Sequence, residues 1–162
     1  MDIKVCSFTG HRVIEARHKD KLMPLLMRGI EYVYSRGCRT FLSGGAIGFD
    51  TLAARAVLEF KKNHSDISLV LVLPCKNQSE KWSAAQKAEY ERILSLADEV
   101  RYITDAYYDG CIKERNLALA EGADVFIAYA HRFNSGTGQT VRMAVNLKKE
   151  VYNLYPELDK NA

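Results

Sequence analysis

Short apolar runs alternate along this chain with longer segments in which apolar residues recur every three or four positions. Such runs are typical of strands, and the helical spacing between them is typical of amphipathic helices. Strands are predicted at residues 3–8, 40–43, 67–73, 100–103, 125–130 and 151–155. Helices are predicted from Asp20 to Gly37, at residues 51–62, 80–97 and 111–121, and after the turn at residues 135–137.

The alternation of strands and helices predicts the fold class. Strands joined by helices pair in parallel through right-handed crossovers. We therefore expect an α/β, Rossmann-like, doubly wound and mainly parallel sheet of about six strands with helices on both faces. The chain shows no internal repeat, low-complexity segment or linker, so residues 1–162 are expected to form a single domain.

Three turns between predicted strands and helices have the chemistry of an anion site. Residues 43–50, Ser-Gly-Gly-Ala-Ile-Gly-Phe-Asp, follow one strand and open a helix. The glycines allow a tight turn, and the helix N–H groups point into it with a positive partial charge. Related turns are Thr-Gly-His-Arg at residues 9–12 and the segment 131–140, which contains Ser-Gly-Thr. A plain connection with glycines that serve packing is the alternative for any one turn.

The three turns are expected to share one site, because parallel winding places every strand-to-helix turn at the carboxyl edge of the sheet. His11 and Arg12 offer an imidazole and a guanidinium, which suit phosphate or carboxylate recognition. Asp50 would repel phosphate, but it could accept hydrogen bonds from ribose hydroxyls, polarise a water or cap the following helix. Arg115, by its helical spacing alone, is typical of a solvated surface charge.

Composition narrows the function classes. The chain is 48% hydrophobic with a net charge of +3, as in ordinary globular proteins, and this charge does not by itself indicate nucleic-acid binding. It has neither an apolar run of about 20 residues nor a secretory pattern, so a cytoplasmic protein without membrane contact is expected. Its four cysteines lack metal-ligand spacing, and no metal is expected. The dinucleotide-oxidoreductase and P-loop fingerprints are also missing, so no cofactor is expected.

Several ordered motifs resemble one family over about residues 3–156. The YpsA-like branch of the SLOG superfamily is similar in Phe-Thr-Gly-His-Arg at residues 8–12, the glycine turn at 43–50, Lys81-Trp82, Asp98, Arg115-Asn116 and Ser-Gly-Thr at 135–137. That superfamily also contains the DNA-processing protein DprA and the LOG phosphoribohydrolases. The resemblance implies a Rossmann-like fold that binds a nucleotide or nucleotide-derived small molecule at the three turns.

The resemblance and the turns together give the expected site. The ligand-binding residues are expected to be Thr9, Gly10, His11, Arg12, Ser43, Gly44, Gly45, Asp50, Arg115, Asn116, Ser135, Gly136 and Thr137. Asp50 is the catalytic candidate, because Thr140 stands where LOG enzymes carry their catalytic glutamate. Ser135 also replaces the first glycine usual in this branch.

These residues favour a sensor or ligand-binding protein, and they leave turnover open. The alternatives are LOG-like cleavage of an N-glycosidic bond and DprA-like single-strand DNA binding. Nucleic acid is not favoured as a partner, because the lysines are scattered and form no basic track. A homo-oligomer is compatible with the sequence.

Overall fold

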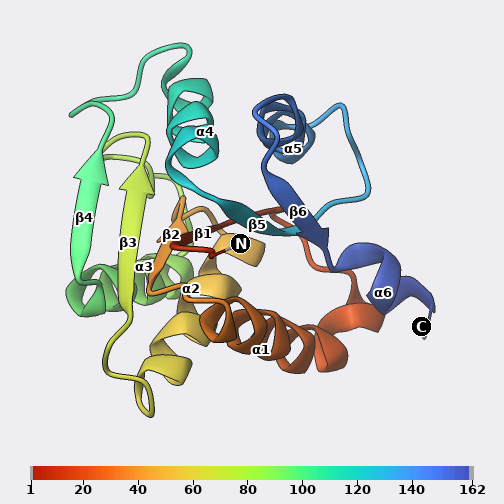
Figure 1. Cartoon of the computed structure of the whole chain (residues 1–162). Helices are drawn as coiled ribbons and strands as arrows, with labels where there is room; N and C mark the ends of the chain where they lie inside the picture. The colour runs from red at the N-terminus through yellow and green to blue at the C-terminus, as the bar shows by residue number, and fades with distance from the viewer. Residues whose placement is uncertain (1, 161–162) are drawn as a thin grey trace.

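The computed structural model describes residues 2–160, which form one sheet with helices on both sides (Figure 1). The strands are β1 (Val5–Gly10), β2 (Thr40–Ser43), β3 (Ser68–Leu73), β4 (Glu99–Tyr102), β5 (Val125–Tyr129) and β6 (Glu150–Asn153). The helices are η1 (Ala16–His18, a 3-10 helix), α1 (Lys19–Ser35), α2 (Phe49–Lys61), α3 (Ala84–Leu96), α4 (Cys111–Gly122), α5 (Gly136–Asn146) and α6 (Tyr155–Lys160).

The sheet has the order β4-β3-β2-β1-β5-β6, and every neighbouring pair is parallel. The chain first moves outward from β1 to β4 and then returns to the other side of β1 with β5. Helices α1, α2 and α3 therefore cover one face, while α4 and α5 cover the other (Figure 1). The doubly wound, Rossmann-like prediction is confirmed, and strand order reverses between β1 and β5.

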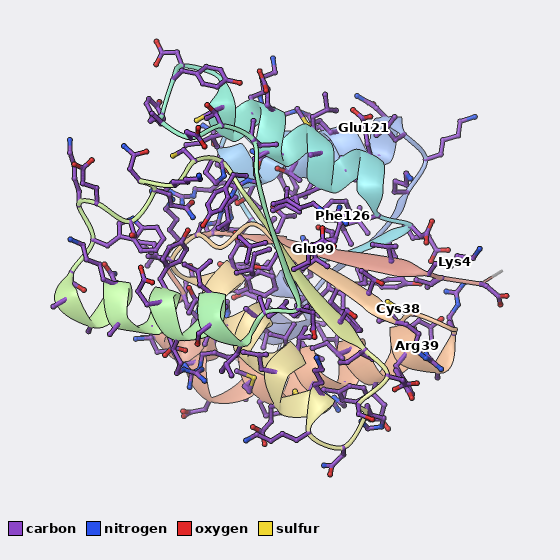
Figure 2. The ribbon with its side chains drawn as sticks, turned by 90° about the vertical axis from the view of Figure 1, so that its left-hand side faces the viewer. Lys4, Cys38, Arg39, Glu99, Glu121 and Phe126 are labelled. Carbon is purple, nitrogen blue, oxygen red and sulfur yellow. The ribbon has the colours of Figure 1, made fainter. Side chains whose placement is uncertain are left out.

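Two apolar cores fix the sheet between its helical layers. The larger core lies on the side of α1 and α2, with Phe8, Phe41 and Phe49 among its buried side chains. The smaller core lies under α4 and α5 and includes Phe126, which is labelled in Figure 2. Because both faces are covered, β3 and β5 are apolar along almost their whole length, as parallel strands usually are.

Two predicted elements differ from the structure. The helix expected from residue 80 begins at Ala84, because Ser83 accepts a hydrogen bond from the N–H of Gln86 (3.2 Å) and donates its own N–H to the Gln86 side chain (3.0 Å). The last strand, expected to reach residue 155, ends at Asn153, and α6 follows. Pro156 would be expected to end a strand, but it lies in the first turn of a helix, where proline is tolerated.

All four cysteines are free and buried. Within residues 2–160, none of the helices combines the length and the apolar character needed to cross a bilayer.

Candidate functional site

A pocket of about 270 Å³ lies at the carboxyl edge of the sheet, where strand order reverses between β1 and β5. Residues from all three predicted turns line it, together with residues from the first three turns of α4. The predicted residues on its wall are Thr9, Gly10, His11, Arg12, Asp50, Arg115, Asn116, Ser135, Gly136 and Thr137. The fold therefore brings residues that are more than 120 positions apart into one cavity.

Some residues predicted for the site do not line the pocket, and some residues that line it were not predicted. Ser43, Gly44 and Gly45 are buried and are not on the described pocket wall. Sequence reasoning missed Phe8, Val13, Ala46, Ile112, Leu119, Arg132 and Thr140 as lining residues. Arg132 and Ala46 lie inside the motifs already noted, so their position was a usable signal. Ile112 and Leu119 gave none, because their helix carries only a weak apolar stripe.

Gly44 and Gly45 shape the turn around other side chains. A Cβ on Gly44 would lie 2.7 Å from Nη1 of Arg115 and 3.0 Å from Oδ2 of Asp50, so the glycine leaves room for both. Gly45 has a φ of +69°, and a Cβ there would collide with the core side chain of Leu73. A bulky residue at position 45 would therefore disturb the core rather than fill the pocket.

Asp50 is the acidic side chain among the residues that line the described pocket. It is 6% exposed, and its Oδ2 accepts a hydrogen bond from the N–H of Ala46 (3.2 Å). Burial raises the pKa of Asp50 to about 6, and the charges of Arg115 and Arg12 oppose the rise. A carboxyl group with this pKa is available both as a hydrogen-bond partner and for proton transfer near neutral pH.

Arg115 proves to be buried, which corrects its interpretation from helical spacing as a solvated surface charge. Only 6% of the residue is exposed. Its Nη1 donates to the carbonyl of Gly44, and its Nε donates to Oδ1 of Asn116 (2.9 Å). The guanidinium thus joins α4 to the turn after β2, and it places a fixed positive charge beside Asp50.

The third turn presents the N-terminus of α5 to the pocket. Ser135 is the N-cap, and its Oγ accepts a hydrogen bond from the N–H of Gly138 (3.2 Å). The N–H groups of Gly136 and Thr137 have no acceptor within the helix, because they belong to its first turn. A Cβ built on Gly136 would meet no atom within 4 Å. This end of the pocket therefore combines helix N–H donors with open space.

Comparison with known proteins defines the family. The YpsA family model, described as "YspA SLOG family", matches residues 7–155. The chain belongs to the YpsA family of SLOG proteins. Curated relatives include YoqJ, an uncharacterised SPbeta prophage-derived protein of Bacillus subtilis strain 168, with 26% identity covering 87% of this chain and 89% of the relative. A UPF0398 protein of Bacillus cereus strain B4264 has 27% identity covering 94% and 88%.

Solved structures support the fold of this YpsA-family chain. DprA from Streptococcus pneumoniae superimposes with a TM-score of 0.65 at 17% identity, covering 91% of this chain and 49% of that one. DprA from Helicobacter pylori, described for its single-stranded DNA binding mode, gives 0.65 at 18% identity, covering 91% and 63%. TM1055 gives 0.58 at 16% identity, covering 91% and 72%. The chain thus spans about half of the pneumococcal protein's length.

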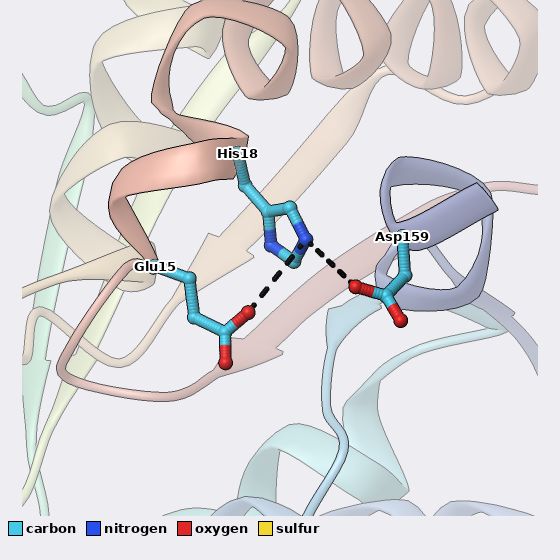
Figure 3. Close-up of side chains that lie close together, drawn as sticks. All are labelled: Glu15, His18 and Asp159. Carbon is cyan, nitrogen blue, oxygen red and sulfur yellow. Dashed lines mark hydrogen bonds and ion pairs between the residues drawn. The ribbon is translucent and has the colours of Figure 1, made fainter. Parts of the chain in front are cut away.

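A second cluster of titratable groups lies outside the pocket of this YpsA-family chain, between η1 and α6 (Figure 3). Glu15, His18 and Asp159 place their ligand atoms within 4.8 Å of one another. Nη2 of Arg17 lies 2.9 Å from Glu15 and 2.7 Å from Asp159, and Nδ1 of His18 lies 2.8 Å from the hydroxyl of Tyr129. Arg17 already supplies a positive charge to both carboxylates, so the cluster ties α6 to the core.

Proposed function

We propose that this chain binds a nucleotide or nucleotide-derived ligand in the pocket at the carboxyl edge of the sheet, as a sensor or ligand-binding protein. The observation that carries the proposal is the meeting of the α5 N-terminus with Arg12, Arg115 and Arg132 around one cavity. A phosphate group fits the α5 end, where helix N–H groups and open space coincide. Asp50 and Asn116 also line the cavity, and we expect them to hydrogen-bond ribose hydroxyls.

Gly136→Val tests the phosphate position. The added side chain enters open space, so folding is expected to be kept while the anion is excluded. A ligand that binds only the folded state stabilises it by about 2.7 kcal/mol at a hundredfold excess over Kd. In a thermal-shift panel of inorganic phosphate and nucleoside mono- and diphosphates, we expect wild type to be stabilised and Gly136→Val not to be.

Asn134→Val is the matched control for that experiment. Asn134 lies in the same turn, is exposed and is not on the described pocket wall, so this variant should respond to ligands as wild type does. Equal stabilisation of Gly136→Val and wild type would remove the α5 end from the site. A panel in which no phosphate compound stabilises wild type would contradict the proposed function itself.

A nucleotide hydrolase is the second candidate, because the pKa of Asp50 near 6 suits acid-base chemistry. We favour the role in which Asp50 holds the ribose of the ligand by hydrogen bonds without catalysis. Oδ2 of Asp50 is engaged by the N–H of Ala46, and Thr140, at the position of the LOG glutamate, donates its hydroxyl to the carbonyl of Gly136 (3.0 Å). Among the residues that line the described pocket, Asp50 has no second carboxylate beside it to complete the acid-base pair that glycosidic cleavage uses.

Incubation of the purified protein with nucleoside monophosphates separates binder from enzyme. As a binder, wild type should release no free base over hours by chromatography, and Asp50→Ala should weaken ligand binding by about 1.5 to 3 kcal/mol, as for a lost hydrogen bond to a charged group. Base release by wild type that disappears in Asp50→Asn, with affinity nearly unchanged, would instead make Asp50 catalytic. Single-strand DNA binding by wild type that survives Gly136→Val would place the DprA-like activity elsewhere on the surface.

A further inference from the structure

His11 makes an uncommon pair of hydrogen bonds at the edge of the pocket. Its Nε2 accepts from the backbone N–H of His131 (2.9 Å) and from that of Arg132 (3.3 Å), while the residue is only 3% exposed. Two successive N–H groups directed at one acceptor form a concave donor pair that in other proteins often binds an anion. Here a side chain of the same chain occupies it.

The backbone of His11 is held from two sides. Its N–H donates to the carbonyl of Tyr129 at the end of β5 (3.2 Å), and its carbonyl accepts from the N–H of Phe49 at the start of α2 (3.1 Å). The imidazole also meets the ring of His131 edge to face, with centroids 4.7 Å apart. His11 is thus fixed relative to β5 and α2, and it can act as a rigid support for the turn that it contacts.

A continuous set of hydrogen bonds leads from this imidazole to the α5 N-terminus. The N–H of Arg132 donates to His11, and the carbonyl of the same residue accepts from Oγ of Ser135 (2.9 Å). Oγ of Ser135 in turn accepts from the N–H of Gly138, which caps the helix. A displacement of Arg132 therefore changes the N-cap and, with it, the helix donors that face the pocket.

We propose that His11 is a positioning residue of the ligand site: as a neutral acceptor for two backbone N–H groups, it holds the turn between β5 and α5 in the conformation that binds an anion. This role replaces the phosphate or carboxylate contact expected for His11, and it deepens the proposed function on which it rests. The site is then sensitive to the protonation of a side chain that itself does not hold the ligand.

The surroundings of His11 favour the neutral imidazole. Burial, together with the charges of His131 and Arg132, lowers the pKa of His11 to about 4, and the charge of Glu15 opposes this shift. The phenol of Tyr129 is the other titratable group packed against the ring. Once protonated, Nε2 becomes a donor facing two donors, so both bonds to the turn are lost.

His11→Gln and His11→Phe separate the acceptor from the ring. The oxygen of glutamine is as many bonds from Cα as Nε2 and cannot be protonated in this range, whereas phenylalanine keeps a ring without an acceptor. Amide hydrogen exchange at residues 131 and 132 in ligand-free protein measures whether the hydrogen bonds from these two N–H groups to position 11 are formed. Inorganic sulfate, a doubly charged anion from pH 3 to 8, reports binding by calorimetry.

At pH 7 we expect wild type and His11→Gln to protect both amides and to bind sulfate. His11→Phe should lose about tenfold in protection and in affinity, as for the loss of two neutral hydrogen bonds. As the pH drops toward 4, wild type should lose sulfate affinity relative to His11→Gln. Asp50 titrates in both proteins, so its effect cancels in this comparison. This pH comparison needs no destabilised variant, so it decides the matter even if His11→Phe does not fold.

Equal exchange of the two amides in all three proteins, or identical pH profiles for wild type and His11→Gln, would overturn the proposal. The proposal would also be overturned if His11→Phe folds and leaves both amides unprotected but still binds sulfate as tightly as wild type. If wild type binds no sulfate, the proposed function loses its phosphate position and the anion-binding part of this proposal fails with it. The amide exchange would then still show whether His11 holds the turn, so the two failures can be told apart.

Discussion

Replacing Arg115 by methionine is expected to lower the free energy of unfolding by about 3 to 5 kcal/mol, the range for removing one partner of a buried charge pair. The guanidinium is buried, donates to the carbonyl of Gly44 and compensates the charge of Asp50. Methionine has a similar volume and no charge. The substitution leaves a buried acceptor without its donor and a carboxylate without its nearest positive charge. Urea unfolding at pH 7 measures the effect.

Lys113→Met is the matched control, because Lys113 is an exposed cation on the same helix, two residues away. A surface substitution of this kind changes stability by no more than about 0.5 kcal/mol. Arg115→Met combined with Asp50→Asn provides the second control. If the two charges compensate each other, the double variant should be more stable than the sum of the single effects by about 0.5 to 3 kcal/mol. Strict additivity would contradict the coupling.

Replacing Asp50 by asparagine is expected to stabilise the protein by up to about 3 kcal/mol at pH 8, since burial raises the pKa of this carboxyl from 3.8 to about 6. Between these values the folded state binds a proton that the unfolded state does not. The wild type therefore loses stability as the pH rises from 3.8 to 6, and the full cost of the buried charge is present above pH 6. Asparagine carries no charge and avoids that cost.

The difference between the two proteins should shrink as the pH falls from 6 and vanish below pH 3.8, where both states of the wild type are protonated. Chemical unfolding of both proteins from pH 4 to 8 measures this. Asp109→Asn, at an exposed position in the loop before α4, should follow the wild type throughout. If Asp50→Asn is instead less stable than wild type at pH 8, the attraction between Arg115 and the carboxylate outweighs the cost of burying the carboxylate charge. If Asp50→Asn is more stable than wild type, Asp50 lowers the stability of the fold, which supports a role for it in ligand binding.

The alternation of strands and helices could be predicted from the local sequence, because apolar runs indicate strands and apolar residues at every third or fourth position indicate helices. Thr40–Ser43 was predicted to the residue, since it is bounded by polar positions and a glycine turn. The missed helix α6 has six residues, too few for a period to be recognised, and its proline signals a stop in a strand but a start in a helix. Its place is set by contacts such as those of Asp159 with Arg17 and His18, far away in the sequence.

The sequence by itself determined the family, the parallel sheet and the edge where the turns meet, because winding direction follows from alternation and the motifs are continuous in the chain. Only the tertiary structure decided what each side chain does there. Arg115 is a surface charge by spacing, but in the fold it is buried and donates a hydrogen bond to the carbonyl of Gly44. His11 is a binding residue by its motif, but its acceptor faces two N–H groups from 120 positions away. Burial and hydrogen-bond direction depend on which elements meet in space, and no local pattern records that.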